Sequence, residues 1–283
     1  MRHRILIPTD FSKNAWHAIK YALELYEHKY CNFYILNVFS ASNNILDSLL
    51  NLGPGSELYE TAKLESENGL AKILNMLAFA DYDNKKHRFE TISSFNNVVE
   101  AIKNVVEEKD IKMIIMGTKG KTDARIMYGS TAINVMEKVR NCPVIVVPEK
   151  STIKLPKEIV FPTNYKTPIE KQELNHLLGI ARNCNASVEI LYISEKGELD
   201  NKQLTNKKFL HESFNGVNNA FHKLSNMDIP TAINCFVESR GSDMVAFINR
   251  KHIFFGSILT HPLVKELGYN SKVPILVMHD LRN

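Results

Sequence analysis

The chain has 283 residues and a formal net charge of +4, with 44% hydrophobic and 23% charged residues. This length predicts two domains that can each bury a core, and the composition is typical of a soluble globular protein. The small charge, spread along the chain, argues against a nucleic-acid-binding protein. No apolar run approaches the roughly eighteen residues of a membrane span, so we expect a cytoplasmic protein without membrane contact.

Cysteine and histidine spacing argues against a metal centre. The four cysteines lie far apart, without a Cys-x-x-Cys pair, and the ten histidines form no His-x-x-x-His pair. Thiols in this arrangement are expected to be reduced and mostly buried. No serine lies in a Gly-x-Ser-x-Gly elbow, so acyl-transfer chemistry is not expected either.

The first half alternates short apolar stretches with segments of helical periodicity. Strands are predicted at 5–8, 33–39, 87–92, 111–116 and 144–147, and helices at 15–26, 57–80, 96–108 and 131–139. This alternation predicts parallel βαβ units and an α/β fold with an open, doubly wound sheet. The segment 43–55 contains a Gly-Pro-Gly turn and is interpreted as a surface loop, the alternative being a lid over a ligand.

The second half repeats the first. The segment 158–165 matches 4–11 at an offset of 154 residues, and 232–277 matches 101–146 at an offset of 131 residues. We therefore predict two tandem domains, 1–149 and 157–283, separated by a polar linker. The second domain is shortened by about 23 residues between the strand at 188–193 and the helix near Ala232. We expect this loss to remove its third strand and part of the preceding helix, because an edge strand has few neighbours.

The stretch 113–131 is the most informative part of the chain. An apolar strand ends at Gly117, a basic loop follows, and Gly129-Ser130 stands where helical periodicity resumes. A P-loop is excluded, because that motif needs a glycine five residues before Gly120, where the chain has Ile115. Two interpretations remain: glycines that merely allow a turn against a helix, and a site for an anionic ligand at a helix N-terminus.

The position of the stretch in the predicted sheet favours the ligand site. The first strand is followed by Asp10 and the fourth ends at Gly117. In an open α/β sheet the carboxyl ends of these strands lie side by side at the switch point, where ligands bind. Asp10 could accept hydrogen bonds from a base or ribose, while Gly129, Ser130 and Thr131 could donate to phosphates.

These motifs together resemble the universal stress protein family. The resemblance rests on Ile-Pro-Thr-Asp10, Met116-Gly-Thr-Lys-Gly120, Gly129-Ser130-Thr131 and the Asn-Cys-Pro143 strand start, and it covers both halves, as in tandem-domain members. It implies two parallel sheets of strand order 3-2-1-4-5, related to adenine alpha hydrolases. Single-domain relatives pair their last strands across a twofold axis, so the chain is expected to be a pseudo-dimeric monomer or a homodimer of such chains.

The resemblance also implies ATP or a related adenine nucleotide, with or without Mg²⁺, bound in the first domain only. The residues that it places at the nucleotide are Pro8, Thr9, Asp10, Val38, Met116, Gly117, Lys119, Gly120, Gly129, Ser130 and Thr131. The family's ATP-binding branch has a Gly-x2-Gly-x9-Gly-Ser/Thr loop, whereas eight residues separate Gly120 from Gly129 here. The shorter spacing either shifts the Gly-Ser pair relative to the phosphates or is absorbed at the loop tip.

The second half has lost the corresponding pattern. Asn164 replaces Asp10, Ile248 and Lys251 replace the first two glycines, and Thr260-His261 replaces the Gly-Ser pair. We therefore expect the second domain to be a structural partner without a nucleotide. Three functions follow: a stress-response protein regulated by an adenine nucleotide and an unidentified protein partner, a nucleotide-free interaction scaffold, and an enzyme of the adenine alpha hydrolase class, which ranks last because its pyrophosphate loop is missing. Hydrolysis, if any, is expected to be slow.

Overall fold

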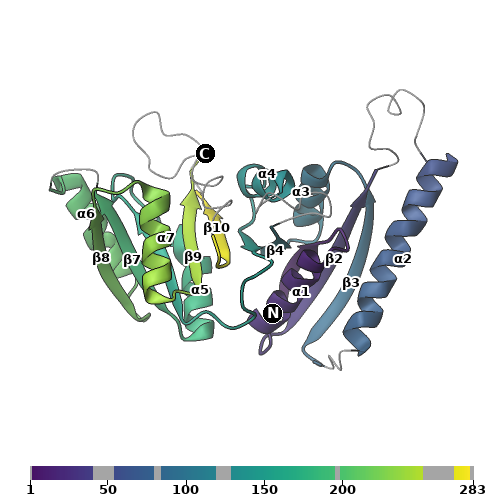
Figure 1. Cartoon of the computed structure of the whole chain (residues 1–283), viewed down its shortest axis with the longest axis horizontal. Coiled ribbons are helices and arrows are strands. Elements are labelled where there is room, and N and C mark those ends of the chain that lie inside the picture. The colour runs from purple at the N-terminus through teal and green to yellow at the C-terminus, as the bar shows by residue number, and fades with distance from the viewer. Residues whose placement is uncertain are drawn as a thin grey trace.

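A computed structural model describes residues 2–40, 54–79, 84–118, 129–194, 198–250 and 271–280. Its centre is one ten-stranded sheet of order β3-β2-β1-β4-β5-β10-β9-β6-β7-β8 (Figure 1). The strands are β1 (His3–Pro8), β2 (Cys31–Phe39), β3 (His87–Phe95), β4 (Met113–Gly117), β5 (Val144–Val147), β6 (Glu158–Thr163), β7 (Ser187–Ser194), β8 (Asn219–Ser225), β9 (Met244–Asn249) and β10 (Ile275–His279). Each half contributes five strands in the predicted order 3-2-1-4-5, so this expectation is confirmed.

Helices cover both faces of the sheet. They are α1 (Lys13–Leu25), α2 (Glu57–Phe79), α3 (Val98–Glu108), α4 (Ser130–Lys138), the short 3₁₀ helix η2 (Lys171–Leu174), α5 (Asn175–Cys184), α6 (Asn201–Ser213) and α7 (Ile229–Arg240). Buried side chains of α1, α2, α5 and α6 share one core, and those of α3, α4 and α7 share the other. The sheet is therefore the middle of three layers.

Alternation along the buried strands supplies both cores. In β1, Ile5 and Ile7 face α1 and α2, whereas Leu6 faces α3 and α4. All three are fully buried, and each β5 side chain is as well. Strands covered on both sides read as continuous apolar runs, which explains why the sequence showed them clearly.

The two halves join through their last strands. β5 and β10 pair antiparallel, with Ile145 opposite Leu276, whereas the pairs within each half are parallel. Side chains across the seam add to this pairing. Arg140, just after α4, donates to the Asn249 carbonyl at 2.9 Å and contacts Asp280 at 2.5 Å, while Asn249 Nδ2 donates to the Met136 carbonyl at 3.1 Å. The last strands thus meet inside one chain.

The expected loss of the third strand in the second half is wrong. β8 is present and pairs with β7 over seven positions, from Val188↔Asn219 to Ser194↔Ser225. The shortening falls on the helix before it, since α2 has 23 residues and α6 has 13, and on the connections around that helix. An edge strand still covers the apolar groups of its neighbour, whereas extra helical turns that extend past the sheet can be lost at lower cost.

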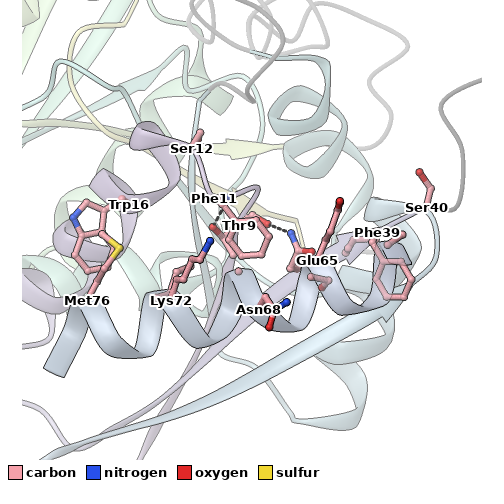
Figure 2. A pocket seen from close by; sticks show the side chains of 16 residues that line it. Thr9, Phe11, Ser12, Trp16, Phe39, Ser40, Glu65, Asn68, Lys72 and Met76 are labelled. Atoms are coloured by element: carbon pink, nitrogen blue, oxygen red, sulfur yellow. Dashed lines mark hydrogen bonds between the residues drawn. The ribbon is translucent and has the colours of Figure 1, made fainter. Parts of the chain in front are cut away.

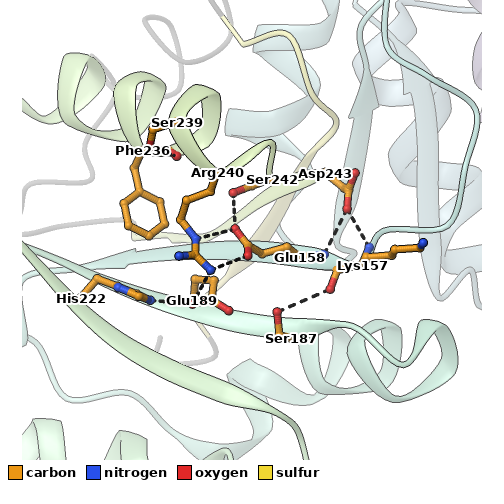
Figure 3. Close-up of polar contacts among 10 residues, drawn as sticks. All are labelled: Lys157, Glu158, Ser187, Glu189, His222, Phe236, Ser239, Arg240, Ser242 and Asp243. Atoms are coloured by element: carbon orange, nitrogen blue, oxygen red, sulfur yellow. Dashed lines mark hydrogen bonds and ion pairs between the residues drawn. The ribbon is translucent and has the colours of Figure 1, made fainter.

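A charged cluster ties together the strands of the second half (Figure 3). Arg240, the last residue of α7, donates to both carboxylate oxygens of Glu158, at 2.9 and 2.7 Å, and lies 3.5 Å from Glu189. Burial alone raises the pKa of Glu158, but hydrogen bonds from Arg240 and Ser242 outweigh it and hold the pKa below its usual value. His222 of β8 contacts Glu189 through its Nε2 atom at 2.5 Å. The cluster therefore joins α7 to three strands.

Candidate functional site

The ends of β1 and β4 lie side by side, as the switch-point argument requires. The two strands pair through Ile5↔Met113 and Leu6↔Ile114, so the residues after Pro8 and the end at Gly117 share one edge of the sheet. Thr9 continues the pairing of β1 with β2, because its N–H donates to the Leu36 carbonyl at 2.8 Å. This edge is where ligands of open α/β sheets bind.

Asp10 is half-buried and organises the turn into α1. Its Oδ1 accepts the Ser12 N–H at 3.1 Å, and Ser12 Oγ accepts the Ala15 N–H at 3.1 Å as the helix N-cap. The second half repeats this turn, with Asn164 Oδ1 accepting the Lys166 N–H at 2.9 Å. A carboxylate is therefore not required to build the turn, and only the first half places a charge there.

Gly117 has a packing reason that involves no ligand. A Cβ on this residue would lie 2.9 Å from Asn14 Cγ and 3.0 Å from the Asn14 carbonyl oxygen. Asn14 is buried, and its Nδ2 donates to Thr118 Oγ1 at 3.1 Å. Helix α1 thus approaches the end of β4 so closely that no side chain fits. The simple packing interpretation of this glycine holds, whether or not a nucleotide also uses the space.

The N-terminus of α4 has no side-chain cap among the described residues. Gly129, its N-cap, has no side chain that could accept a hydrogen bond from the first turn. The Gly129 N–H donates to the Thr118 carbonyl at 2.6 Å, which closes the two ends of the loop and occupies that donor. Ser130 and Thr131 are exposed in the first turn. An uncapped first turn is a favourable place for an anion, because its N–H groups lack intrahelical partners.

The predicted site residues fall into three groups. Thr9, Asp10 and Gly117 are at the shared strand ends, with buried Pro8 and Met116 just before them and half-buried Val38 near the end of β2. Gly129, Ser130 and Thr131 follow at the start of α4. Lys119 and Gly120 lie outside the described residues, as do most of the segment 43–55, interpreted above as a surface loop or a lid, and Lys251, Thr260 and His261 of the second half.

The second half differs at the matching strand end. Ile248 is 2% exposed and packs in the core beside α5, where the first half has Gly117. The turn after the first strand is nevertheless shared by the two halves. Phe11 and Tyr165 both have positive φ, 63° and 58°, and the N–H group of each donates to Oγ1 of the threonine two residues earlier at 3.1 Å. The repeat therefore preserves the local backbone, while the residues proposed for ligand contact differ.

Sequence reasoning missed a groove next to this edge. It has a volume of about 760 Å³ and lies between α1, the end of β2 and α2 (Figure 2). Thr9 and Val38 of the predicted residues line it, together with Trp16 of α1. The sequence signal for this groove is Gly69, a glycine in the interior of α2. Phe11 packs directly on the helix backbone at this residue.

Comparison with known proteins agrees with this geometry. A profile of the universal stress protein family matches residues 1–148, which is just over half of the chain. The chain belongs to the universal stress protein family. It is similar to Universal stress protein MJ0577 of Methanocaldococcus jannaschii, with 29% identity over 160 residues that cover 54% of this chain and 98% of the relative. Universal stress protein MJ0531 of that organism is 30% identical over 145 residues, covering 51% and 81% of the two chains.

Solved structures extend the comparison of the fold to both halves. A universal stress protein from Archaeoglobus fulgidus superposes with a TM-score of 0.72 and 16% identity, covering 98% of each chain. A putative universal stress protein from Pseudomonas aeruginosa gives a TM-score of 0.62 and 9% identity over 98% of this chain and 93% of that one. The tandem universal stress protein architecture is therefore an established fold.

The described residues contain neither a membrane-spanning helix nor a metal-binding cluster. None of the helices in these parts of the chain is sufficiently long and apolar to cross a membrane. Within the same residues, His, Cys, Asp and Glu side chains form no group of three that could hold a metal ion. The four cysteines are free thiols, and burial raises the pKa of Cys184 to about 11, which keeps that thiol protonated at neutral pH.

Proposed function

We propose that this universal stress protein binds ATP or a related adenine nucleotide at the strand-end edge of its first half. The main support is the uncapped N-terminus of α4, with Ser130 and Thr131 exposed beside the ends of β1 and β4. Phosphates would occupy the free donors of α4, and Lys119 and Gly120 of the intervening loop would add to them. Asp10 would accept from the ribose or base, next to Pro8, Val38 and Met116.

The nucleotide acts as a regulator in this proposal. No dedicated base or metal-binding carboxylate pair is among the proposed contacts, so turnover would be slow at most, with or without Mg²⁺. Nucleotide binding would change the conformation of the strand-end edge, to which the loop 119–128 belongs, and thereby the surface that a protein partner contacts. The second half, in which Ile248 fills the position of Gly117, would serve as an intramolecular partner.

Thermal unfolding of the full chain with ATP tests the proposal. Ligand at about a hundred times its Kd should stabilise the protein by about 2.7 kcal/mol. Asp10→Asn should fold normally, because Asn164 holds the same turn in the second half, yet weaken ATP binding about tenfold or more by removing the carboxylate. Asn164→Asp is the matched control and should leave ATP binding unchanged.

Three outcomes would contradict the proposal or favour another function. An absence of stabilisation at millimolar ATP would favour the nucleotide-free scaffold. Equal ATP affinity in Asp10→Asn and the wild type would contradict the proposed contact between the Asp10 carboxylate and the nucleotide. Sustained phosphate release of many turnovers per minute would favour an enzyme of the adenine alpha hydrolase class. Comparing ATP with adenosine in Ser130→Ala separates phosphate contacts from base contacts, since only ATP should bind more weakly.

A further inference from the structure

The groove between α1 and α2 adjoins the proposed nucleotide edge and shares Thr9 and Val38 with it, but most of its lining residues lie beyond that edge. It lies on the face of the sheet covered by α1 and α2, whereas Met116 packs into the core on the α3 and α4 face. Gly129, Ser130 and Thr131 are not among its lining residues. Its volume of about 760 Å³ falls in the range of roughly 300–1,000 Å³ that is typical of small-molecule sites. The groove can therefore hold a ligand of its own.

Phe11 and Gly69 shape the middle of the groove. A Cβ on Gly69 would lie only 2.4 Å from the Phe11 ring, so the ring rests on the backbone of α2. Phe11 reaches this position from a left-handed backbone conformation, fixed by its N–H bond to Thr9 Oγ1. The floor is also fixed, because buried Asn37 donates to the Thr9 carbonyl at 2.7 Å. The aromatic surface is thus held in place before any ligand arrives.

The second half shows that the fold does not require such a groove. Tyr165, the counterpart of Phe11, is 2% exposed and stacks on Tyr192 with ring centroids 5.1 Å apart. Side chains of α6 bond directly to the same turn: Gln203 Nε2 donates to the Asn164 carbonyl at 2.8 Å, and Asn206 Nδ2 to the Tyr165 carbonyl at 2.6 Å. The shorter helix is thus anchored on its turn, whereas α2 leaves a space there.

The lining chemistry indicates the class of ligand. Phe11 and half-buried Trp16 offer aromatic faces, and Met76 adds a polarisable thioether beside the indole (Figure 2). Lys72 stands one turn from Met76 on α2 and extends toward Phe11, whereas Glu65 lies further along the helix (Figure 2). Among the described residues that line the groove, Lys72 is the only Lys or Arg and Glu65 the only Asp or Glu. This pair suits a ligand with one negative charge and disfavours a polyphosphate. The groove therefore matches a planar ring that carries one anionic group.

We propose that the groove between α1 and α2 binds a small aromatic monoanion, such as an aromatic carboxylate or sulfonate, independently of the nucleotide. The ring packs against Trp16 and Phe11, and the anion pairs with the Lys72 ammonium. Occupation would couple the start of α1 to α2. Since Asp10 belongs to the turn that begins α1, this second ligand would act next to the nucleotide edge, with Trp16 and Lys72 as contacts of its own.

The chain carries its own reporter for this site, because Trp16 is its single tryptophan. Titration of the full chain with 8-anilinonaphthalene-1-sulfonate, an aromatic monoanion, should quench Trp16 emission saturably at one site per chain. Lys72→Met should weaken this binding about fivefold or more. Lys63→Met, on the same helix but not lining the groove, should bind as the wild type does. The uncharged analogue 1-anilinonaphthalene should not distinguish the two variants.

The outcomes that overturn the proposal are distinct from failure at the nucleotide edge. Equal affinity for the sulfonate in Lys72→Met and Lys63→Met would show that the probe adheres to other apolar surface. Absence of saturable quenching up to millimolar probe would also overturn it. Displacement of the probe by ATP would show that the two ligands share one site. Probe binding that is unchanged in Asp10→Asn supports independence, whatever ATP itself does.

Discussion

At the scale of single residues, the strand-end edge depends on how closely α1 approaches β4. Gly117 leaves no room for a Cβ because Asn14 lies against it, and the amide of Asn14 bonds Thr118. This contact sets the position of the first turn of α1, which carries the Asp10 turn. Gly117, which the sequence pattern assigns to a phosphate-binding loop, is thus also required for the packing of α1 on β4. Its substitution is therefore a poor test of ligand binding.

We predict that Gly117→Ala lowers the free energy of unfolding by about 1–3 kcal/mol, the usual cost of an overpacked site. The added methyl group would meet a backbone oxygen as well as a side chain, so α1 must shift to accommodate it. Gly179→Ala is the control: nothing lies within 4 Å of its Cβ position in α5, and alanine there should stabilise by about 0.5–1 kcal/mol. Urea unfolding measures both. Equal stability of Gly117→Ala and the wild type would contradict the close packing.

At the scale of elements, sequence patterns placed the strands and helices of the first half close to their observed bounds but missed one strand of the second half. Strands buried on both faces are continuous apolar runs, which made β1, β4 and β5 easy to recognise. β8 was missed because it is an edge strand, with only Leu224 and Phe221 as partly buried large apolar groups packed on the cores. The groove was missed for a related reason, since it arises from how α2 packs on Phe11 and not from any local motif.

The charged cluster of the second half adds ion pairs at the end of α7 to the apolar contacts of that helix with the strands, and the contribution of these ion pairs to stability depends on pH. Arg240→Met should lower stability by about 1–2 kcal/mol at pH 7, at the low end for charge-assisted hydrogen bonds because the side chain is partly exposed. The pKa of Glu158 is lowered in the folded protein, so its contribution is full above the unfolded value and is lost as pH falls through the folded pKa.

The stability difference between wild type and Arg240→Met should therefore narrow in acid. Urea midpoints at pH 7 and near pH 3 measure it, with Lys272→Met as a control for a cation in an exposed ion pair, that with Glu238. The control should change stability little at either pH. A difference between wild type and Arg240→Met that is as large in acid as at pH 7 would show that packing of Arg240 over the Phe236 ring, and not its charge, dominates.

At the scale of the whole molecule, the repeat predicted the architecture more completely than any local pattern. Matching segments at constant offsets implied two sheets of one topology, and the antiparallel pairing of β5 with β10 joins them into one. What the sequence did not predict are the side chains that hold this seam, such as Arg140 and Asn249, because their partners lie more than a hundred positions away. Such contacts carry no periodic signal.

The seam also predicts how an isolated first half behaves. The fragment 1–149 would end just after β5, whose side chains are fully buried in the intact chain, and would expose an unpaired apolar strand edge. Such an edge pairs readily with another copy of itself. Because β10 runs antiparallel to β5, two fragments related by a twofold axis can re-create the pairing.

We therefore expect the fragment to form a dimer at micromolar concentrations, measured by light scattering after size exclusion. Within the fragment, Val146→Pro should remove a strand donor from the free edge and shift the equilibrium toward monomer, since the Val146 partner in the intact chain is Ile275. Far-UV circular dichroism of that variant checks that the fragment remains folded. A wild-type fragment that is folded yet monomeric throughout this range would mean that the pairing of β5 depends on the second half being in the same chain.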